Sequence, residues 1–177
     1  MRLALIALLA LAGSVQAKEW TLGQPSTLGF SGSYQGEKFS GKFPGFSARI
    51  TLDKADLANA RLEVEIDVTS VTTDNSDYDA ELKGADFFNF AKFPKARFVS
   101  TAVKESGGAL VADGNLTIRD KTRPVQLKLD FKPAGDSATL DVQATLKRLD
   151  FDVGTGEWAD TSLISGDIQV TSHLVLK

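Results

Sequence analysis

The sequence of 177 residues contains no cysteine and a single histidine. Without cysteine the chain has no disulfide framework, no thiol nucleophile, no thiolate metal site and no cysteine for lipid attachment. The histidine, His173, alternates with the apolar Leu174, so we expect it on the solvated face of a strand. The residue types that most often build catalytic sites are therefore scarce.

Motifs of the common enzyme classes are also absent. The sequence has no Gly-x-Ser-x-Gly elbow, no phosphate-binding loop and no dinucleotide-binding fingerprint. Acidic residues between Asp74 and Glu81 suggest calcium, but Leu82 stands where an EF-hand loop counted from Asp77 needs glycine. Carboxylates in the first turn of a helix explain this cluster better. We expect neither an enzyme nor a metal site.

Long hydrophobic runs are confined to the N-terminus. Arg2, the apolar run 3–12 and the small-residue sequence ending at Ala17 have the form of a signal peptide. The run is shorter than the roughly 20 residues that span a bilayer. We expect residues 1–17 to be a signal peptide cleaved after Ala17, and residues 18–177 to form one domain in a bacterial periplasm. The net charge of −3, without a block of like charge, gives no sign of nucleic-acid binding.

Most of the remaining chain alternates apolar and polar residues with a period of two. This pattern is typical of antiparallel strands that have one dry and one solvated face. About eight such strands are expected, near 28–34, 46–52, 61–68, 96–104, 109–119, 124–131, 138–146 and 167–176. Their apolar faces have to cover one another, which predicts an all-β barrel or two-sheet sandwich.

Two features favour an eight-stranded antiparallel barrel with an open interior. Eight strands enclose a space that side chains fill or that holds one small ligand. Several positions on the apolar faces are small and would leave volume inside, namely Gly32, Ala48, Ala112, Gly114, Ala144 and Ser172. The alternative is a solid core in which small and large residues interdigitate, and the sequence does not decide between the two.

The stretch 74–98 interrupts the strand pattern and holds five of the eleven phenylalanines. Ser76 with Asp79 three residues later fits a helix capping box, and Gly84 predicts a left-handed C-cap. So many rings cannot all face water. We predict a short helix and a phenylalanine loop that plug one end of the barrel. A loop that simply completes the core is the alternative.

Five collinear stretches carry a resemblance to a known family: FSGKFPGFSARITLD (39–53), EVEIDVTSVTT (63–73), AELKGADFFNFAKFPKARF (80–98), DGNLTIRDKTRPVQLKLDF (113–131) and KRLDFDVGTGEWAD (147–160). The chain resembles the YceI family of exported, lipocalin-like barrels that bind polyisoprenoids. The resemblance implies an eight-stranded barrel whose apolar channel takes a long isoprenoid, either a polyprenyl phosphate or a quinone tail. It implies a carrier or reservoir and no enzyme. A histidine often found in the family's early strand is absent, since the sequence there reads Gln24-Pro25-Ser26.

Within this interpretation, alternation in the strands selects the residues expected to line the ligand. They are Phe30, Phe46, Ile50, Val64, Ile66, Leu116, Leu127, Leu129 and Val142, with Phe87, Phe88 and Phe90 at the plugged end. A polyprenyl phosphate would favour a cationic rim, for which Arg49, Arg97, Arg123 and Arg148 are candidates; a quinone would need none. No cofactor is expected other than the bound isoprenoid or quinone. Transient contact with membranes and a homodimer are both compatible with this interpretation.

Two other functional classes fit parts of the pattern. A small outer-membrane barrel also has a signal peptide, no cysteine and alternating strands. Against it, only two tryptophans and two tyrosines are available for interfacial girdles, and the chain ends in Lys177 and not in an aromatic residue. The phenylalanine loop also needs an apolar interior. The third class is a structural or interaction barrel with a solid core.

Overall fold

The computed structural model of the protein describes residues 17–177, so the predicted signal peptide lies, apart from Ala17, outside the described residues. These residues form one antiparallel sheet of ten strands, one α-helix and four short 3-10 helices. The strands are β1 (Glu19–Trp20), β2 (Leu22–Tyr34), β3 (Glu37–Lys42), β4 (Phe46–Thr51), β5 (Arg61–Asp67), β6 (Lys95–Ser106), β7 (Ala109–Ile118), β8 (Lys121–Ala134), β9 (Ser137–Lys147) and β10 (Asp167–Leu176). The helices are α1 (Ser76–Leu82), η1 (Leu57–Asn59), η2 (Val68–Ser70), η3 (Arg148–Phe151) and η4 (Gly156–Ala159).

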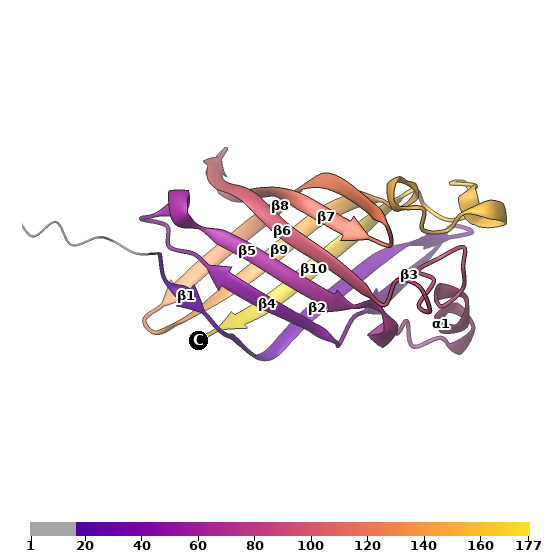
Figure 1. Cartoon of the computed structure of the whole chain (residues 1–177), viewed down its shortest axis with the longest axis horizontal. Helices are drawn as coiled ribbons and strands as arrows, with labels where there is room; N and C mark the ends of the chain where they lie inside the picture. Colours follow the sequence, from indigo (N-terminus) through magenta and orange to yellow (C-terminus); the bar gives the residue numbers. More distant parts are fainter. Residues whose placement is uncertain (1–16) are drawn as a thin grey trace, which may run out of the picture.

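The sheet curls into a barrel with strand order β1-β4-β5-β6-β7-β8-β9-β10-β2-β3. Only Thr21 separates β1, which pairs with β4, from β2, which pairs with β10. This change of partner closes the ring at the end where β1 and the C-terminus lie (Figure 1). Towards the other end β2 pairs with β3, and within residues 17–177 no ladder joins β3 to β4. The barrel is therefore closed by strand pairing at one end and by loops at the other.

The end closed by strand pairing is solid. The Trp20 ring packs edge-on against Phe131 with ring centroids 5.8 Å apart, and its indole N–H donates to the carbonyl of Leu52 at 2.8 Å. Leu140 and Leu176 beside them have no exposed surface. This end is packed as an ordinary hydrophobic core.

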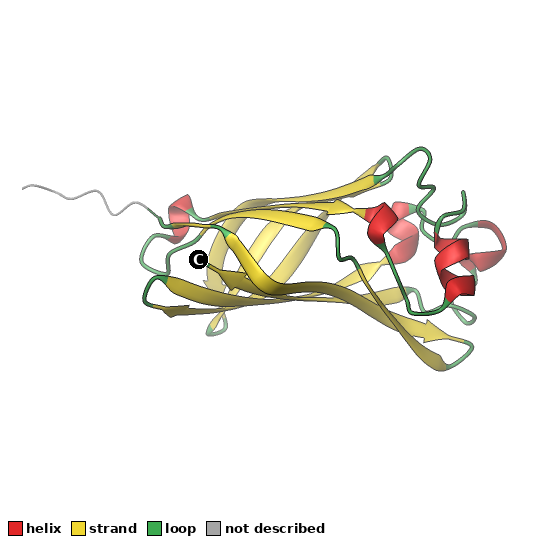
Figure 2. Ribbon diagram, turned by 90° about the horizontal axis from the view of Figure 1, so that it is seen from below, coloured by secondary structure: helices red, strands yellow, loops and turns green. Residues whose placement is uncertain are grey.

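Most of the helical turns gather at the opposite end of the barrel (Figure 2). Helix α1 begins after Asn75, whose side chain accepts hydrogen bonds from two backbone N–H groups of the first turn. The predicted cap, Ser76, is therefore wrong by one residue, because either side chain has a capping oxygen and only the backbone decides between them. The predicted left-handed C-cap at Gly84 is also wrong, since Lys83 stays right-handed and Gly84 has no positive φ. No helix in residues 17–177 is long and apolar enough to cross a membrane.

The predicted antiparallel barrel is confirmed, with two strands more than the alternation indicates. The extra strands are the two-residue β1 and the six-residue β3. The inward faces follow the predicted alternation except in β6. There a bulge between Ser100 and Ala102 shifts the register, so that Val103 is buried and Ala102 is exposed.

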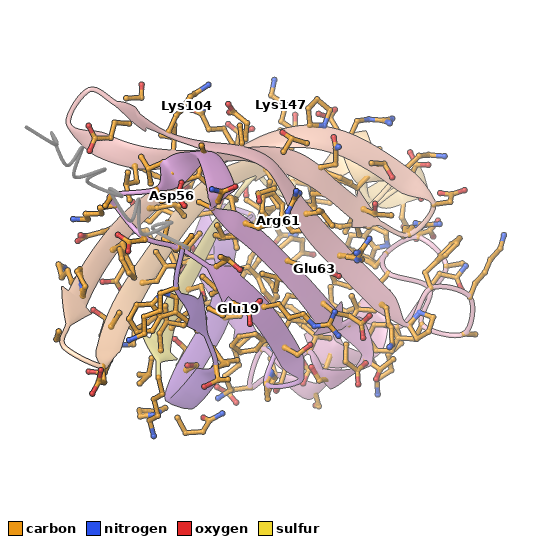
Figure 3. All side chains as sticks on the ribbon, turned by 60° about the vertical axis from the view of Figure 1, so that its left-hand side comes forward. Glu19, Asp56, Arg61, Glu63, Lys104 and Lys147 are labelled. Atoms are coloured by element: carbon orange, nitrogen blue, oxygen red, sulfur yellow. The ribbon has the colours of Figure 1, made fainter. Side chains whose placement is uncertain are left out.

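The outer face of the barrel is charged. Lys95 pairs with Glu65 and Arg97 with Glu63 across β5 and β6, each at 2.6 Å. Figure 3 shows Lys104 directed away from the barrel, where its ammonium pairs with a carboxylate of β7. A transmembrane barrel needs an apolar outward band and often has a polar lumen. The observed pattern is the reverse, which argues against the outer-membrane alternative.

Candidate functional site: an apolar cavity at the plugged end

A cavity of about 210 Å³ lies inside the barrel, between the solid end and the helical turns. Of the thirty residues that line it, only Arg148 and Ser172 have polar side chains. The Ser172 hydroxyl donates to the carbonyl of Thr27 at 2.8 Å. The wall is therefore almost entirely hydrocarbon.

Ten of the twelve residues predicted to contact a ligand line this cavity. They are Phe30, Phe46, Ile50, Val64, Ile66, Phe87, Phe88, Leu116, Leu127 and Val142. Phe90 lies behind Phe88, with the two rings stacked 6.4 Å apart, and Leu129 belongs to the packed core at 3% exposure. The structure thus brings together most of the predicted set; contact with a ligand stays a prediction.

The six small inward positions differ in whether they border the cavity. Ala144 and Ser172 line the cavity. Gly32, Ala48, Ala112 and Gly114 do not line it: Phe39 and Ile168 fill the space above Gly32, the Phe98 ring covers Gly114, and Ala112 is fully buried in the packed core. The solid-core alternative therefore describes the closed end, and the open-interior prediction describes the plugged end.

The predicted phenylalanine plug is confirmed at the cavity's edge. Phe87 is buried, and both Phe87 and Phe88 line the cavity. The Phe88 ring contacts Phe43 at 5.9 Å between centroids, and Phe43 contacts Phe30 of β2 at 5.3 Å. Aromatic rings thus connect the loop to the barrel wall at the place where, within residues 17–177, no ladder joins β3 to β4.

The plug contains a second loop that the sequence analysis does not predict. The loop 148–166, between β9 and β10, also lines the cavity through Phe151, Val153 and Ile164. Its backbone N–H groups at Gly154 and Thr155 donate to the carbonyl of Asp86 at 2.6 and 2.9 Å, which joins it to the phenylalanine loop. The sequence feature that could have indicated this loop is the pair of apolar residues, Phe151 and Val153, inside a Gly-rich connection.

Arg148 organises this second loop from inside. Its side chain is buried at 5% exposure, and within residues 17–177 it has no carboxylate partner. All five guanidinium N–H groups instead donate to backbone carbonyls at 2.6–3.1 Å, those of Val153, Gly154, Trp158, Ile164 and Ser165. Burial lowers the pKa of Arg148, although an arginine stays charged in proteins. No N–H of this guanidinium remains for a ligand.

Arg119 fastens the two loops to each other. One of its terminal nitrogens donates to the carbonyls of Phe87 and Asp152, one in each loop. Its guanidinium lies 5.7 Å from the centre of the Phe93 ring. The plug is therefore a single unit made of two loops.

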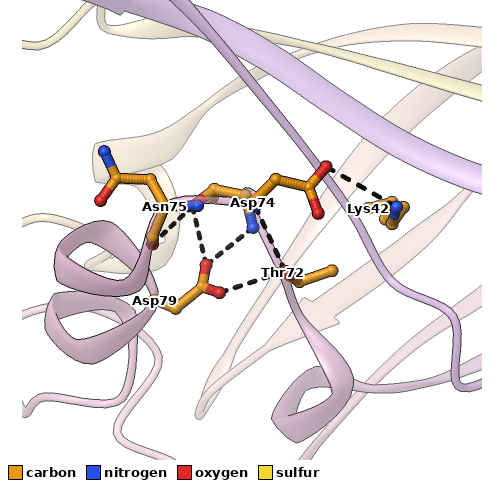
Figure 4. Close-up of polar contacts among 6 residues, drawn as sticks. Lys42, Thr72, Asp74, Asn75 and Asp79 are labelled. Carbon is orange, nitrogen blue, oxygen red and sulfur yellow. Dashed lines mark hydrogen bonds and ion pairs between the residues drawn. The ribbon is translucent and has the colours of Figure 1, made fainter.

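Helix α1 is tied to β3 by a polar network (Figure 4). Asp79 accepts hydrogen bonds from the backbone N–H and the hydroxyl of Thr73, both at 2.7 Å, and from the hydroxyl of Thr72 at 3.1 Å. Thr72 in turn exchanges two backbone hydrogen bonds with Lys42, whose ammonium lies 3.7 Å from Asp74. Burial would raise the pKa of Asp79, but these hydrogen bonds outweigh it and hold the pKa below its usual value. The network therefore joins β3 to the segment that connects β5 with α1.

Comparisons with known proteins agree with this architecture. A family model described as YceI-like domain matches residues 20–176. The chain belongs to the YceI family. It is 33% identical over 161 residues to Protein YceI of Salmonella arizonae, covering 85% of this chain and 84% of that protein. Among solved structures it is similar to BcnA of Burkholderia cenocepacia, with a TM-score of 0.81 and 33% identity over 85% of this chain and 95% of that one. A polyisoprenoid binding domain from Saccharophagus degradans shares the fold, with a TM-score of 0.69 and 16% identity over 91% and 98% of the two chains.

In this YceI-family chain, the four candidate arginines are not brought together. Arg97 is held by Glu63 on the outer face, and Arg49 and Arg123 are exposed. Arg148 faces inward, and carbonyls take all its donors. These residues therefore form no cationic rim around the cavity.

His173 lies on the outer face as predicted. Its Nδ1 is 2.6 Å from a carboxylate oxygen of Asp141, the residue directly opposite on β9. That partner was missed because it depends on the register between two strands. In the part of the chain that the structure describes, no three acidic or histidine side chains gather as a metal site needs.

Proposed function

We propose that this member of the YceI family is a non-catalytic periplasmic carrier for a long isoprenoid lipid, whose tail enters the apolar cavity. The observation that carries the proposal is the hydrocarbon wall, in which the two polar side chains already have hydrogen-bond partners. Such a wall binds through the hydrophobic effect and dispersion and offers nothing to orient a polar substrate.

The absence of acid–base groups in the wall supports a non-catalytic role. Arg148 is the one ionisable residue among the thirty lining residues, and carbonyls take all its N–H groups. General acid–base catalysis needs a titratable group within hydrogen-bond reach of the reacting atom. For the class of lipid, the polyisoprenoid binding domain of S. degradans, which shares this fold, supports an isoprenoid.

A tail-length series tests this function. Delipidated protein is titrated with isoprenoids that share one polar end and carry one to eight isoprene units. Each methylene that enters the cavity contributes about 0.8 kcal/mol, or roughly a fourfold gain in affinity. We expect steep gains over the shortest tails and a plateau once the cavity is full. An affinity that does not depend on tail length would overturn the proposal.

A further inference from the structure

The cavity is too small to enclose a whole isoprenoid. Its volume is about 210 Å³, and a protein cavity of about 150 Å³ takes a molecule the size of benzene. On the proposed function, the cavity therefore holds part of the tail, and the rest of the lipid, with its polar end, lies outside. The tail has to pass through one end of the barrel or through its wall.

Both ends of the barrel are fastened. Trp20 and Phe131 belong to the packed core that fills the closed end. At the other end, Arg119 donates hydrogen bonds to a carbonyl in each of the two plug loops, and the backbone N–H of Gly154 donates to the carbonyl of Asp86. A tail that entered at either end would have to displace packed rings or break these hydrogen bonds.

The wall of the barrel is interrupted beside the cavity. Strands β8 and β9 pair from their hairpin up to Lys128 and Gln143, and the ladder stops there. Within residues 17–177, the remaining parts of the two strands, 121–127 and 144–147, pair only on their other sides, with β7 and β10. Pro124 lies in this stretch of β8 and has no N–H to donate, as is typical of a strand edge. We call this interruption, which ends at the loop 148–166, the β8–β9 seam.

Few contacts cross the seam. The outward side chains of Thr122 and Gln126 hydrogen-bond to β7, at 2.8 and 2.7 Å, and that of Thr145 hydrogen-bonds to β10 at 2.9 Å. Within residues 17–177, no side-chain hydrogen bond or ion pair joins the two unpaired segments to each other. The ion pair of Lys121 with Asp152, at 3.2 Å, lies where the seam meets the loop 148–166.

The interruption between β3 and β4, by contrast, is bridged. The Phe43 ring packs against Phe30 and Phe88, and Lys42 exchanges two backbone hydrogen bonds with Thr72. An opening there would break these contacts. The β8–β9 seam is therefore the stretch of wall that opens most easily.

The seam leads directly to the cavity. The inward side chains of its two strands, Val125 and Leu127 from β8 and Ala144 and Leu146 from β9, all line the cavity. All four are hydrocarbon, so a tail that passes between them stays in apolar surroundings and displaces no buried charge. Separating the two segments also leaves the ladders of both strands with their other neighbours intact.

We propose that an isoprenoid tail enters and leaves the cavity through the β8–β9 seam, and that its polar end stays outside where the seam meets the loop 148–166. This inference rests on the proposed function and adds the route of the lipid to it. A linear hydrocarbon chain suits such a passage because it is narrow and has no polar group that must lose its water.

The test closes the seam with a covalent link. Continuing the register of Lys128 and Gln143 along both strands places Gln126 opposite Thr145, and both side chains are exposed. In the delipidated mature protein, the variant Gln126→Cys/Thr145→Cys is joined by a short bis-methanethiosulfonate reagent, whose link is cleaved by reduction. The natural chain has no cysteine, so the reagent joins only the introduced thiols. Stopped-flow quenching of tryptophan fluorescence by an isoprenoid quinone measures the rate of uptake.

Two other linked pairs serve as controls. The variant Val99→Cys/Asn115→Cys joins residues that lie directly opposite each other in the ladder of β6 and β7. The variant Asp86→Cys/Thr155→Cys joins the two plug loops at side chains that lie 3.1 Å apart. Neither link crosses the seam, and the second holds shut the plug, which is the competing route.

We expect the link across the seam to slow uptake by about tenfold or more and to leave the equilibrium affinity unchanged, because closing a passage slows entry and exit alike. Reduction is expected to restore the rate, and neither control link is expected to change it. An unchanged rate with the seam linked, or slowing of the same size by either control link, would overturn the passage and leave the proposed function standing. If the unlinked protein does not bind the quinone, the proposed function itself fails, and the passage fails with it.

Discussion

Ala112 and Ala144 show how two similar residues come to differ in role. Both are alanines on the inward faces of their strands, at 0% and 9% exposure. Ala112 belongs to the packed core, whereas Ala144 lines the cavity. Alternation gives the direction of each side chain, but the filling of the space opposite depends on strands that are distant in sequence.

Replacing each alanine with phenylalanine distinguishes the two environments. Ala112→Phe adds a ring where none fits, and overpacking typically costs about 1–3 kcal/mol. Ala144→Phe places its ring in the cavity, so we expect unchanged stability and weaker lipid binding. Urea unfolding and lipid titration of delipidated protein measure the two effects, because bound lipid would itself stabilise the fold.

Lys128→Phe, on the outer face of β8, is the control and is expected to leave lipid binding intact. A large loss of stability in Ala144→Phe, equal to that in Ala112→Phe, would contradict the cavity at this position.

Arg148 is predicted to be a structural residue and not a ligand-binding residue. Arg148→Met keeps a long side chain but leaves five carbonyls without their donors, and each buried unsatisfied group costs about 1–3 kcal/mol. Some of these carbonyls regain water as the loop loosens, so we expect a loss of about 3 kcal/mol in the free energy of unfolding. Chemical denaturation measures it.

The control for this change is Arg123→Met, since the exposed Arg123 donates only to the carbonyl of its neighbour Thr122. Its stability is expected to stay close to that of the wild type. An Arg148→Met protein as stable as the control would show that the carbonyl contacts do not hold the loop.

At the scale of elements, alternation predicts most strands and their inward faces, because one side of an antiparallel sheet is dry. It fails at the bulge in β6, where Ser100 is buried and its hydroxyl accepts the backbone N–H of Leu62 at 2.8 Å. The alternating pattern does not indicate that a serine hydroxyl accepts a hydrogen bond from the backbone of another strand. The loop 148–166 was missed for a related reason, since its order depends on Arg148 and on the carbonyl of Asp86.

The network around Asp79 makes the attachment of α1 to β3 dependent on pH. Because the pKa of Asp79 is lower in the folded than in the unfolded protein, its contribution is fully present above the usual aspartate value of about 3.9. It is lost as the pH falls through the lowered folded value. We expect Asp79→Asn to reduce the free energy of unfolding by about 0.5–1 kcal/mol at pH 7, a figure reduced for solvent screening.

Urea unfolding of both proteins between pH 7 and pH 2.5 checks this dependence. The difference between them is expected to shrink below about pH 4. Asp136→Asn, in an exposed turn, serves as the control. A difference that stays constant down to pH 2.5 would mean that the charge of Asp79 does not contribute.

At the scale of the whole molecule, the barrel is asymmetric, with a solid closed end and a hollow plugged end. The sequence predicted a barrel, a plug and ten of the residues that line the cavity. It did not predict how the interior is divided, because that depends on which large side chains meet across the barrel. Trp20 and Phe131 meet at the closed end although 111 positions separate them in the sequence. No local pattern contains that contact.

The two tryptophans of the chain mark the two ends of the barrel, which provides the most direct test of the account. Trp20 lies in the solid end, and Trp158 lies in the plug, with its ring 5.7 Å from that of the cavity-lining Phe87.

The variants Trp20→Phe and Trp158→Phe each retain a single tryptophan as the fluorophore. Both delipidated proteins are titrated with an isoprenoid quinone, whose ring quenches tryptophan at short range. The account predicts strong quenching of Trp158 and weak quenching of Trp20, since the tail enters the cavity and the quinone stays at the plug. Quenching of Trp20 that equals or exceeds that of Trp158 would contradict it.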